Sequence, residues 1–356
     1  MSCSFALGAL SLLAVVPQDP TPAKPAAPPA TKAAAEAPTW QVLKTFAVGG
    51  DGGWDYVTID SEARRLYVPR ATRVLVLDAD TGKQVGEITD TAGVHGVALA
   101  PQLGRGFTSN GRADTCTVFD LKDGKAQKAI ATGKNPDALT FEPTTKCIYI
   151  GNGRSNDVTV IAADKLEVVA TIPIGGKPEA MVVDGNGKVF VNVEDKSEVV
   201  RIDASKNAVE QHLPLAPGTE PTGLAIDAEH HLLFAACSNE KMVVLDAATG
   251  KVLASPAIGK RTDGAAFDVP SGCAITANGE GSLSIVATRG DQPFTVVQTL
   301  PTAAGARTLV LDPKSRQLYL PTADVENAPA DASGGRRSRR IKADSFRIVV
   351  VGLAAH

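Results

Sequence analysis

A short phrase that occurs twice constrains the fold of this chain more than any other feature of its sequence. VLDADTGK spans residues 76–83 and VLDAATGK spans residues 244–251, and seven of the eight residues are identical. The offset of 168 residues equals four intervals of 42, and related segments occur at each interval. The aspartate of the phrase and its equivalents are Asp78, Asp120, Ala162, Asp203 and Asp246. A period of 40 to 45 residues is typical of a β-propeller blade.

A second phrase recurs in step with the first and gives the number of units. It consists of a small or polar residue, about four apolar residues and then usually an acid, as in DYVTID, DALTFE and TGLAID. Its seven copies end at Asp60, Ala100, Glu142, Asp184, Asp227, Asp268 and Asp312. Each unit contains four short apolar or alternating runs separated by turn residues, which is the pattern of a four-stranded antiparallel sheet. The sequence therefore predicts an all-β chain, a seven-bladed β-propeller.

The two ends of the repeat region predict how the ring closes. The last unit contains only three strand-like runs, and the missing fourth run is found at residues 40–50, WQVLKTFAVGG. Pairing this segment with the last unit would remove an exposed sheet edge. We therefore expect the propeller to span residues 39–353, with the N-terminal strand completing the last blade.

The residues before the repeats indicate export. Residues 1–16 contain an apolar run of signal-peptide length, and residues 17–38 form a Pro/Ala-rich linker. We expect a periplasmic or secreted monomer with no membrane span after the signal is removed. The cysteines form no CxxC pair, and those at positions 116, 147, 237 and 273 are expected to be unpaired core residues.

Several blades resemble a known family of repeats. The segments GKNPDALTFEPTTKCIYIGNGRSNDVTVIAADKLEVVATIPIGG and GARTLVLDPKSRQLYLPTA are similar to the YVTN repeats of the YncE-like propeller proteins. The resemblance implies a seven-bladed, exported propeller and says little about activity. A relative in that family is regarded as a DNA binder, so the resemblance adds non-specific DNA binding as an alternative.

Candidate binding residues lie on two sets of loops that share one face of a propeller. These are the loops that enter the innermost strands and the loops between the second and third strands. The candidates are Trp54, Asp55, His95, Arg112, Asp137, Asn152, Arg154, Glu179, Glu194, Lys196, Asp263, Glu280 and Arg307. One interpretation is that these side chains only pair with one another and fix the loops.

The functional interpretation is a polar channel mouth that binds a small polar or anionic molecule, or a protein partner, without catalysis. Arg112, Arg154 and Arg307 would hold a carboxylate or phosphate. No cofactor is required for this function. The alternative is a metal-dependent, lactonase-like hydrolase that holds a hard divalent ion such as calcium. Its candidate ligands are Asp55, Asp137, Glu179, Asp263 and Glu280.

The last unit also carries an insertion at about residues 323–344. It contains a basic run with Arg336, Arg337, Arg339 and Arg340. This run is either a solvated loop or a surface that binds an anionic polymer or lipid in a salt-sensitive way. Export disfavours nucleic acid as its partner, and the net charge of −3 gives no overall attraction to polyanions.

Overall fold

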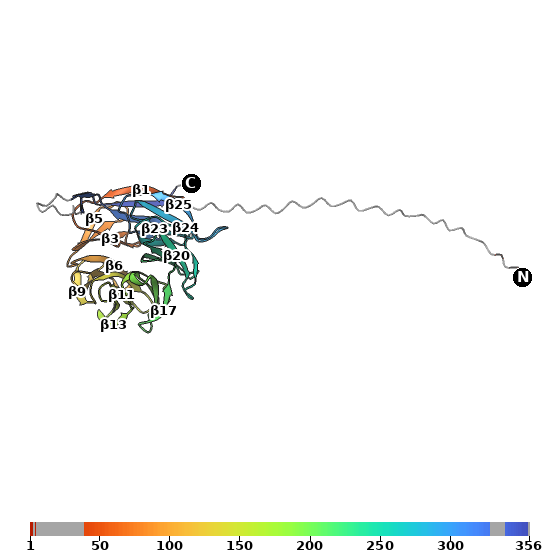
Figure 1. The fold of residues 1–356 in the computed structure, drawn as a ribbon, viewed down its shortest axis with the longest axis horizontal. Coiled ribbons are helices and arrows are strands. Elements are labelled where there is room, and N and C mark those ends of the chain that lie inside the picture. Colours follow the sequence, from red (N-terminus) through yellow and green to blue (C-terminus); the bar gives the residue numbers. More distant parts are fainter. Residues whose placement is uncertain (3, 5–38, 328–338, 355–356) are drawn as a thin grey trace. The chain divides into compact units, whose positions relative to one another are not determined.

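Seven four-stranded antiparallel sheets are arranged in a ring (Figure 1). The computed structural model describes residues 1–2, 4, 39–327 and 339–354. Each innermost strand contacts the innermost strand of the next sheet, and the last of them, β26, contacts the first, β2. The predicted seven-bladed β-propeller is confirmed.

The two inner layers of strands come from the same positions of each repeat. The innermost strands are β2 (Thr58–Asp60), β6 (Val94–Ala100), β10 (Pro136–Glu142), β14 (Pro178–Val183), β18 (Pro221–Asp227), β22 (Thr262–Asp268) and β26 (Val310–Asp312). The second strands are β3 (Arg65–Arg70), β7 (Arg105–Asn110), β11 (Cys147–Asn152), β15 (Lys188–Val193), β19 (Leu232–Cys237), β23 (Cys273–Asn278) and β27 (Gln317–Thr322).

The two outer layers follow the same order. The third strands are β4 (Arg73–Asp78), β8 (Thr115–Asp120), β12 (Asp157–Ala162), β16 (Glu198–Asp203), β20 (Lys241–Asp246), β24 (Ser282–Ala287) and β30 (Arg347–Leu353). The outermost strands are β5 (Gln84–Ile88), β9 (Ala126–Ala131), β13 (Glu167–Pro173), β17 (Ala208–Pro214), β21 (Val252–Ala254), β25 (Thr295–Pro301) and β1 (Trp40–Ala47). Two 3₁₀ turns, Pro101–Leu103 and Glu194–Lys196, complete the elements of the blades.

The ring closes as the sequence predicted. Strand β1 pairs antiparallel with β30, from Trp40 opposite Leu353 to Ala47 opposite Arg347. The side chain of Gln298 on β25 of the neighbouring blade accepts a hydrogen bond from the Trp40 N–H at 2.9 Å. The same side chain donates to the Trp40 carbonyl at 2.7 Å. The N-terminal strand is thus held both by its own sheet and by the next blade.

The repeated phrase forms the turn between the third and outermost strands. The Asp78 carboxylate accepts hydrogen bonds from the Thr81 N–H at 2.9 Å and the Thr81 hydroxyl at 2.8 Å. Gly82 has a φ of 71°, and a Cβ there would lie 2.2 Å from Cγ of Phe46 on the neighbouring blade. Both constraints require glycine at this position. The second copy of the phrase, at Asp246, Thr249 and Gly250, repeats the same contacts.

The core lies between neighbouring blades. Second and third strands are buried along almost their whole length, whereas outermost strands such as β17 alternate between exposed and less exposed residues. This follows because each blade is covered on both faces by its neighbours except at the rim. The four described cysteines are buried and free.

The insertion in the last blade contains a short hairpin. Strands β28 (Val325–Asn327) and β29 (Arg339–Ile341) pair antiparallel, and Arg340 forms an ion pair with Glu326 at 2.7 Å. Arg336 and Arg337 of the basic run lie outside the described residues, as do the linker and almost all of the expected signal segment. Among the residues that the structure describes, none belongs to a helix long and apolar enough to cross a membrane.

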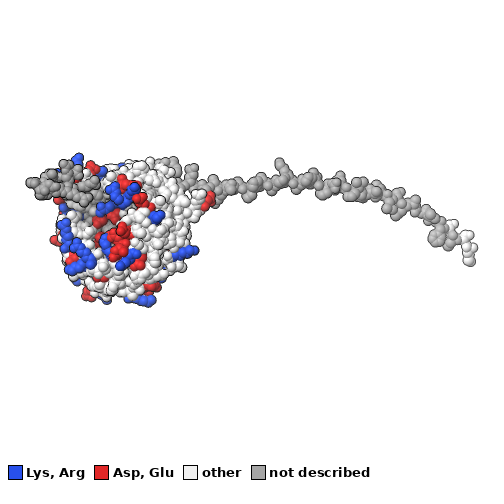
Figure 2. All heavy atoms as spheres, in the orientation of Figure 1, with Lys and Arg blue, Asp and Glu red and all other residues white. Residues whose placement is uncertain are grey.

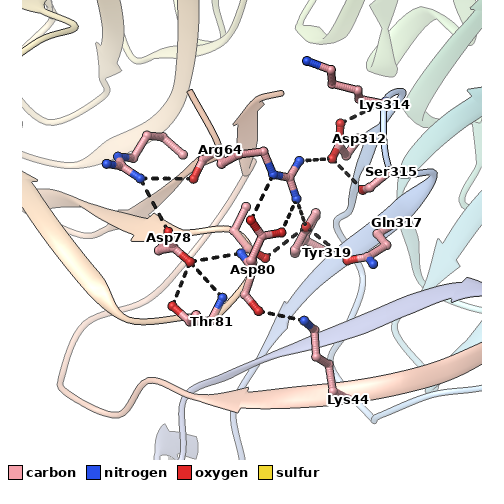
Figure 3. Close-up of polar contacts among 12 residues, drawn as sticks. Lys44, Arg64, Asp78, Asp80, Thr81, Asp312, Lys314, Ser315, Gln317 and Tyr319 are labelled. Carbon is pink, nitrogen blue, oxygen red and sulfur yellow. Dashed lines mark hydrogen bonds and ion pairs between the residues drawn. The ribbon is translucent and has the colours of Figure 1, made fainter. Parts of the chain in front are cut away.

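On the face opposite the candidate loops, a polar network joins the last blade to the first (Figure 3). The Arg64 guanidinium forms ion pairs with Asp80 at 2.7 Å and with the buried carboxylate of Asp312. The Tyr319 hydroxyl donates to the Ala79 carbonyl at 3.1 Å. Burial alone would raise the pKa of Asp312, but hydrogen bonds from Ser315, Ser61 and Arg64 lower it to about 2. The network therefore reinforces the closure made by β1.

We expect Asp312→Asn to destabilise the propeller by about 2–3 kcal/mol at pH 7, because Arg64 loses its buried partner. The pKa of Asp312 lies below the ordinary value of 3.8, so its stabilising effect is complete above pH 4. That effect is lost as the pH falls towards 2. Denaturant unfolding between pH 2 and 7 measures both effects. The control is Glu62→Gln, which breaks an exposed pair with Lys314 and should cost less than about 0.5 kcal/mol. Equal losses in the two variants would contradict this role of the network.

Candidate functional site

One position of the repeat, five residues before the end of the second phrase, supplies a group of side chains that we name the mouth ring. Its members are Asp55, His95, Asp137, Glu179, Thr222, Asp263 and Arg307. Each lies at or just before the start of an innermost strand, and these strands contact one another around the ring. The equivalence of the positions brings four carboxylates, an imidazole and a guanidinium to one end of the channel.

Three members of the mouth ring form a compact cluster. The Nδ1 atom of His95 lies 2.7 Å from a carboxylate oxygen of Asp55 and 3.6 Å from a carboxylate oxygen of Asp137. The side chains of Asp55, His95 and Asp137 are 21%, 29% and 14% exposed. The cluster is therefore sheltered but reachable from solvent.

A second group lies around Glu179. Lys177 forms ion pairs with Glu179 at 2.9 Å and with Glu194, which comes from the loop between β15 and β16. The Tyr56 hydroxyl, from the first blade, donates to Glu179 of the fourth blade at 3.2 Å. Tyr56 thus crosses the channel beneath the mouth ring. Tyr56 was not among the residues predicted from the sequence, although its place next to Asp55 in DYVTID is a usable signal.

Arg307 forms an ion pair within the mouth ring. Its guanidinium pairs with the Asp263 carboxylate at 2.5 Å, so its charge is already matched inside the ring. This ion pair, and the place of Arg307 outside the residues that line the pocket with Arg112 and Arg154, do not favour the expectation that the three arginines act together. Arg307 and Asp263 come from adjacent blades at equivalent positions, and this proximity favours the pair.

Burial and mutual repulsion change the acidity of the mouth ring. Burial raises the pKa of Asp137 to about 6 and the pKa of Glu179 to about 7, and the nearby carboxylates add to both shifts. Burial also raises the pKa of Asp263. Burial alone would lower the pKa of His95, but the hydrogen bond with Asp55 and the charge of Asp137 raise it. The ring thus favours bound protons or cations over free negative charge.

A pocket of about 310 Å³ opens beside the His95 cluster, and we name it the mouth pocket. Loops of both expected kinds line it. The residues are Gly53, Trp54, Asp55, Ala71, Gly93, Val94, His95, Gly111, Arg112, Asn135 and Arg154. The predicted convergence of the two loop sets thus occurs here. On the face seen in Figure 2, acidic side chains also gather in patches with basic side chains directly beside them.

Arg70 holds the loop that carries Trp54 and Asp55. Its buried guanidinium donates four hydrogen bonds to the carbonyls of residues 49–52 and lies 3.8 Å from the centre of the Phe346 ring. Trp54 packs on the same Phe346 ring, with centroids 5.6 Å apart. This wall of the mouth pocket is therefore fixed by buried contacts.

Three further candidates, Asn152, Glu280 and Lys196, lie outside the lining of the mouth pocket. Asn152 is fully buried and donates to Asp157 at 2.6 Å and Thr159 at 2.8 Å, so it cannot contact a ligand as we had expected. Glu280 is exposed and accepts a hydrogen bond from Ser282 of its own blade. Lys196 is exposed at the end of a 3₁₀ turn. None of these three lines the mouth pocket as described.

The comparisons with known proteins agree with this fold. Residues 66–327 match the family model described as the cytochrome D1 heme domain. The chain belongs to this family. The protein YncE of Salmonella typhimurium strain LT2 and that of Salmonella typhi are each 26% identical to it over 148 residues. These matches cover 40% of this chain and only 42% of each YncE chain. They confirm the YncE resemblance inferred from the repeats.

A solved structure supports the architecture at low sequence identity. A chain of the hydrazine synthase of Kuenenia stuttgartiensis superposes with a TM-score of 0.68 and 16% identity. The superposition covers 83% of this chain and 97% of that chain. At this identity the likeness shows the shared fold.

The family name raises the question of whether these residues could hold a haem, and the geometry does not fit. Haem iron is usually held by a His, Met, Cys or Tyr side chain. His95 is the one histidine among the mouth residues, its Nδ1 is bonded to Asp55, and its Nε2 lies against Gly111. The cavity of about 160 Å³ beside Tyr56, between the innermost strands, is smaller than the mouth pocket of about 310 Å³. We derive no haem chemistry for this site.

We expect Glu179→Gln to stabilise the metal-free protein at pH 8 by roughly 2 kcal/mol and to have little effect at pH 5. The reason is that the pKa of Glu179 in the folded chain, about 7, lies above its ordinary value of 4.5. The folded state therefore favours protonated Glu179, and this stabilising effect is lost as the pH rises through 7. Glutamine mimics the protonated form. Denaturant unfolding at both pH values, with a chelator present, measures the change.

The control is Glu167→Gln on the exposed strand β13, which should be neutral at both pH values. A loss of stability in Glu179→Gln at pH 8 would show instead that the carboxylate is stabilised by Lys177.

Proposed function

We propose that this chain is a binding protein whose mouth pocket takes a small anionic ligand between Arg112 and Arg154. One observation carries the proposal: both arginines line the pocket, and neither has a carboxylate partner within the described part of the chain. Guanidinium groups form bidentate hydrogen bonds with carboxylate and phosphate. Two such groups on one pocket are suited to an anion.

The backbone around the arginines supports this function. A Cβ at Gly93 would lie 2.6 Å from Cγ of Arg112 and 2.7 Å from its backbone nitrogen, so the start of the Arg112 side chain rests on the glycine. The Arg154 N–H donates to the Lys134 carbonyl at 3.0 Å. The backbone that carries both arginines is therefore fixed. Both residues are exposed and line the pocket.

The mouth ring restricts the kind of anion. Asp55 and His95 line the same pocket, and Asp137 lies against His95. Negative charge on the ligand would be repelled by these carboxylates except at the arginine side. The chemistry favours a molecule with one carboxylate or phosphate at one end and hydroxyl or amine donors at the other, such as a sugar acid or hydroxy acid.

We also propose that the protein acts outside the cytoplasm. The apolar run and the Pro/Ala-rich linker that precede the propeller support export. Mass spectrometry of the protein produced in its native host should give an N-terminus within the first 38 residues, after the apolar run. An intact Met1 on the mature protein would contradict export by a cleaved signal.

We expect the double substitution Arg112→Ala and Arg154→Ala to weaken binding of such an anion by at least about tenfold for each guanidinium removed. The measurement is a thermal-shift panel of sugar acids, hydroxy acids and phosphates, followed by calorimetric titration of the strongest ligand. At a concentration of 100 times the dissociation constant, a ligand should stabilise the wild-type protein by about 2.7 kcal/mol. The stability of the unliganded protein should hardly change because both side chains are exposed.

The matched control is Arg289→Ala, which removes a half-exposed arginine beside Asp227 on the opposite face. It should leave anion binding unchanged. If Arg289→Ala weakens binding as much as the double variant, the anion responds to overall charge and not to the mouth pocket. If no ligand of the panel stabilises the wild-type protein, the proposal is also contradicted.

A further inference from the structure

We propose that Asp55, His95 and Asp137 bind a divalent first-row transition metal at the inner side of the mouth pocket. The inference extends the proposed anion site, because the metal would lie in the same pocket. Metal binding can be measured with no anionic ligand present, so either proposal can fail alone.

The donor atoms of the three side chains lie close enough together to share one ion after small adjustments. One atom from each of the three side chains can be chosen so that all lie within 4.8 Å of one another. The contacts from His95 Nδ1 to Asp55 and Asp137 are 2.7 and 3.6 Å. Ligand atoms at the usual 2.0–2.2 Å from a tetrahedral ion are roughly 3.4 Å apart. Small side-chain rotations would therefore place the three atoms around one metal.

The three donor side chains come from equivalent backbone positions in three blades. Asp55, His95 and Asp137 occupy the same repeat position in three consecutive blades. His95 and Asp137 lie within β6 and β10, and Asp55 lies before β2 on the loop that Arg70 holds. These innermost strands contact one another. A site built on packed strands keeps its geometry better than one built on free loops.

The charges of the mouth ring favour a cation beside Asp137. Lys177 is engaged by Glu179 and Glu194, and Arg307 by Asp263. Asp137 is only 14% exposed, and no described residue donates a hydrogen bond to its carboxylate; the Nδ1 atom of His95 lies 3.6 Å from it. A sheltered carboxylate with no donor is costly unless a cation or a proton accompanies it.

The donor set selects the class of metal. Imidazole nitrogen favours zinc, iron, nickel and copper, whereas sites made only of oxygen favour calcium and magnesium. One imidazole with two carboxylates is a mixed nitrogen and oxygen donor set, and zinc and iron(II) both accept such mixed ligands. Three protein ligands also leave a coordination position free, and the mouth pocket with Arg112 and Arg154 lies on the open side. A bound anion could then contact both the metal and the arginines.

Cobalt(II) provides a direct test, because its visible d–d absorption reports both binding and ligand geometry. Untagged, chelator-treated full-length protein is titrated with Co²⁺, and Zn²⁺ is then added as a competitor. We expect one equivalent of Co²⁺ to bind with visible bands typical of four or five ligands, and Zn²⁺ to displace it. His95→Gln and Asp137→Asn should each weaken Co²⁺ binding by more than about 100-fold, because each removes a ligand.

Asp263→Asn is the matched control. It removes one negative charge from the same ring but lies outside the three-residue cluster, and it should weaken Co²⁺ binding by less than about threefold. Unfolding curves of all variants show whether each is folded. Absence of d–d bands in the folded wild-type protein would overturn the proposal and leave protonated His95 as the cation between the two aspartates. Equal losses for Asp137→Asn and Asp263→Asn would also overturn it, since charge alone would then explain binding.

Discussion

The antiparallel pairing of β1 with β30 is the interaction on which the rest of the structure depends. It joins the first and last strands of the propeller, and only a closed ring brings the first blade next to the last. The Arg64 network and the Gln298 contacts with Trp40 strengthen the same junction. Because the ring is closed, one repeat position from every blade meets at the channel mouth, and Tyr56 of the first blade can reach Glu179 of the fourth.

The chemistry of the mouth follows from crowding carboxylates into a sheltered space. Four of the seven positions of the mouth ring are acidic, and two basic side chains, Lys177 and Arg307, neutralise part of that charge. The unmatched remainder lies around His95, directly beside a pocket lined by Arg112 and Arg154, neither of which pairs with a carboxylate among the described residues. This chain belongs to the family described as the cytochrome D1 heme domain, and charged side chains line its mouth pocket; sites of different kinds are carried by one fold.

Much of the fold was readable from the sequence because its determinants are local and repeated. Asp78, Thr81 and Gly82 specify one turn by hydrogen bonds and by a positive φ, and their repetition gives the blade period. The closing strand at residues 40–50 was predictable from the strand missing in the last unit. The positions of the mouth ring followed from the same repeat.

The roles of individual site residues were less predictable, because they depend on neighbours from other blades. Arg307 was expected to clamp an anion, but Asp263 of the preceding blade neutralises it. Asn152 was predicted to line the mouth because it stands at the end of a second strand. In the structure its side chain is buried and donates hydrogen bonds to Asp157 and Thr159. The short hairpin of β28 and β29 lies in an insertion outside the repeat, so no other blade could indicate its structure.

Anomalous diffraction from a crystal soaked in Co²⁺ and selenate would test the central claim, that the channel mouth is a single built site for a metal and an anion. Data at the cobalt and selenium edges locate the two elements independently. The account predicts one cobalt peak among Asp55, His95 and Asp137 and one selenium peak between Arg112 and Arg154. Peaks confined to the opposite face, or no ordered peak in the mouth pocket, would contradict it.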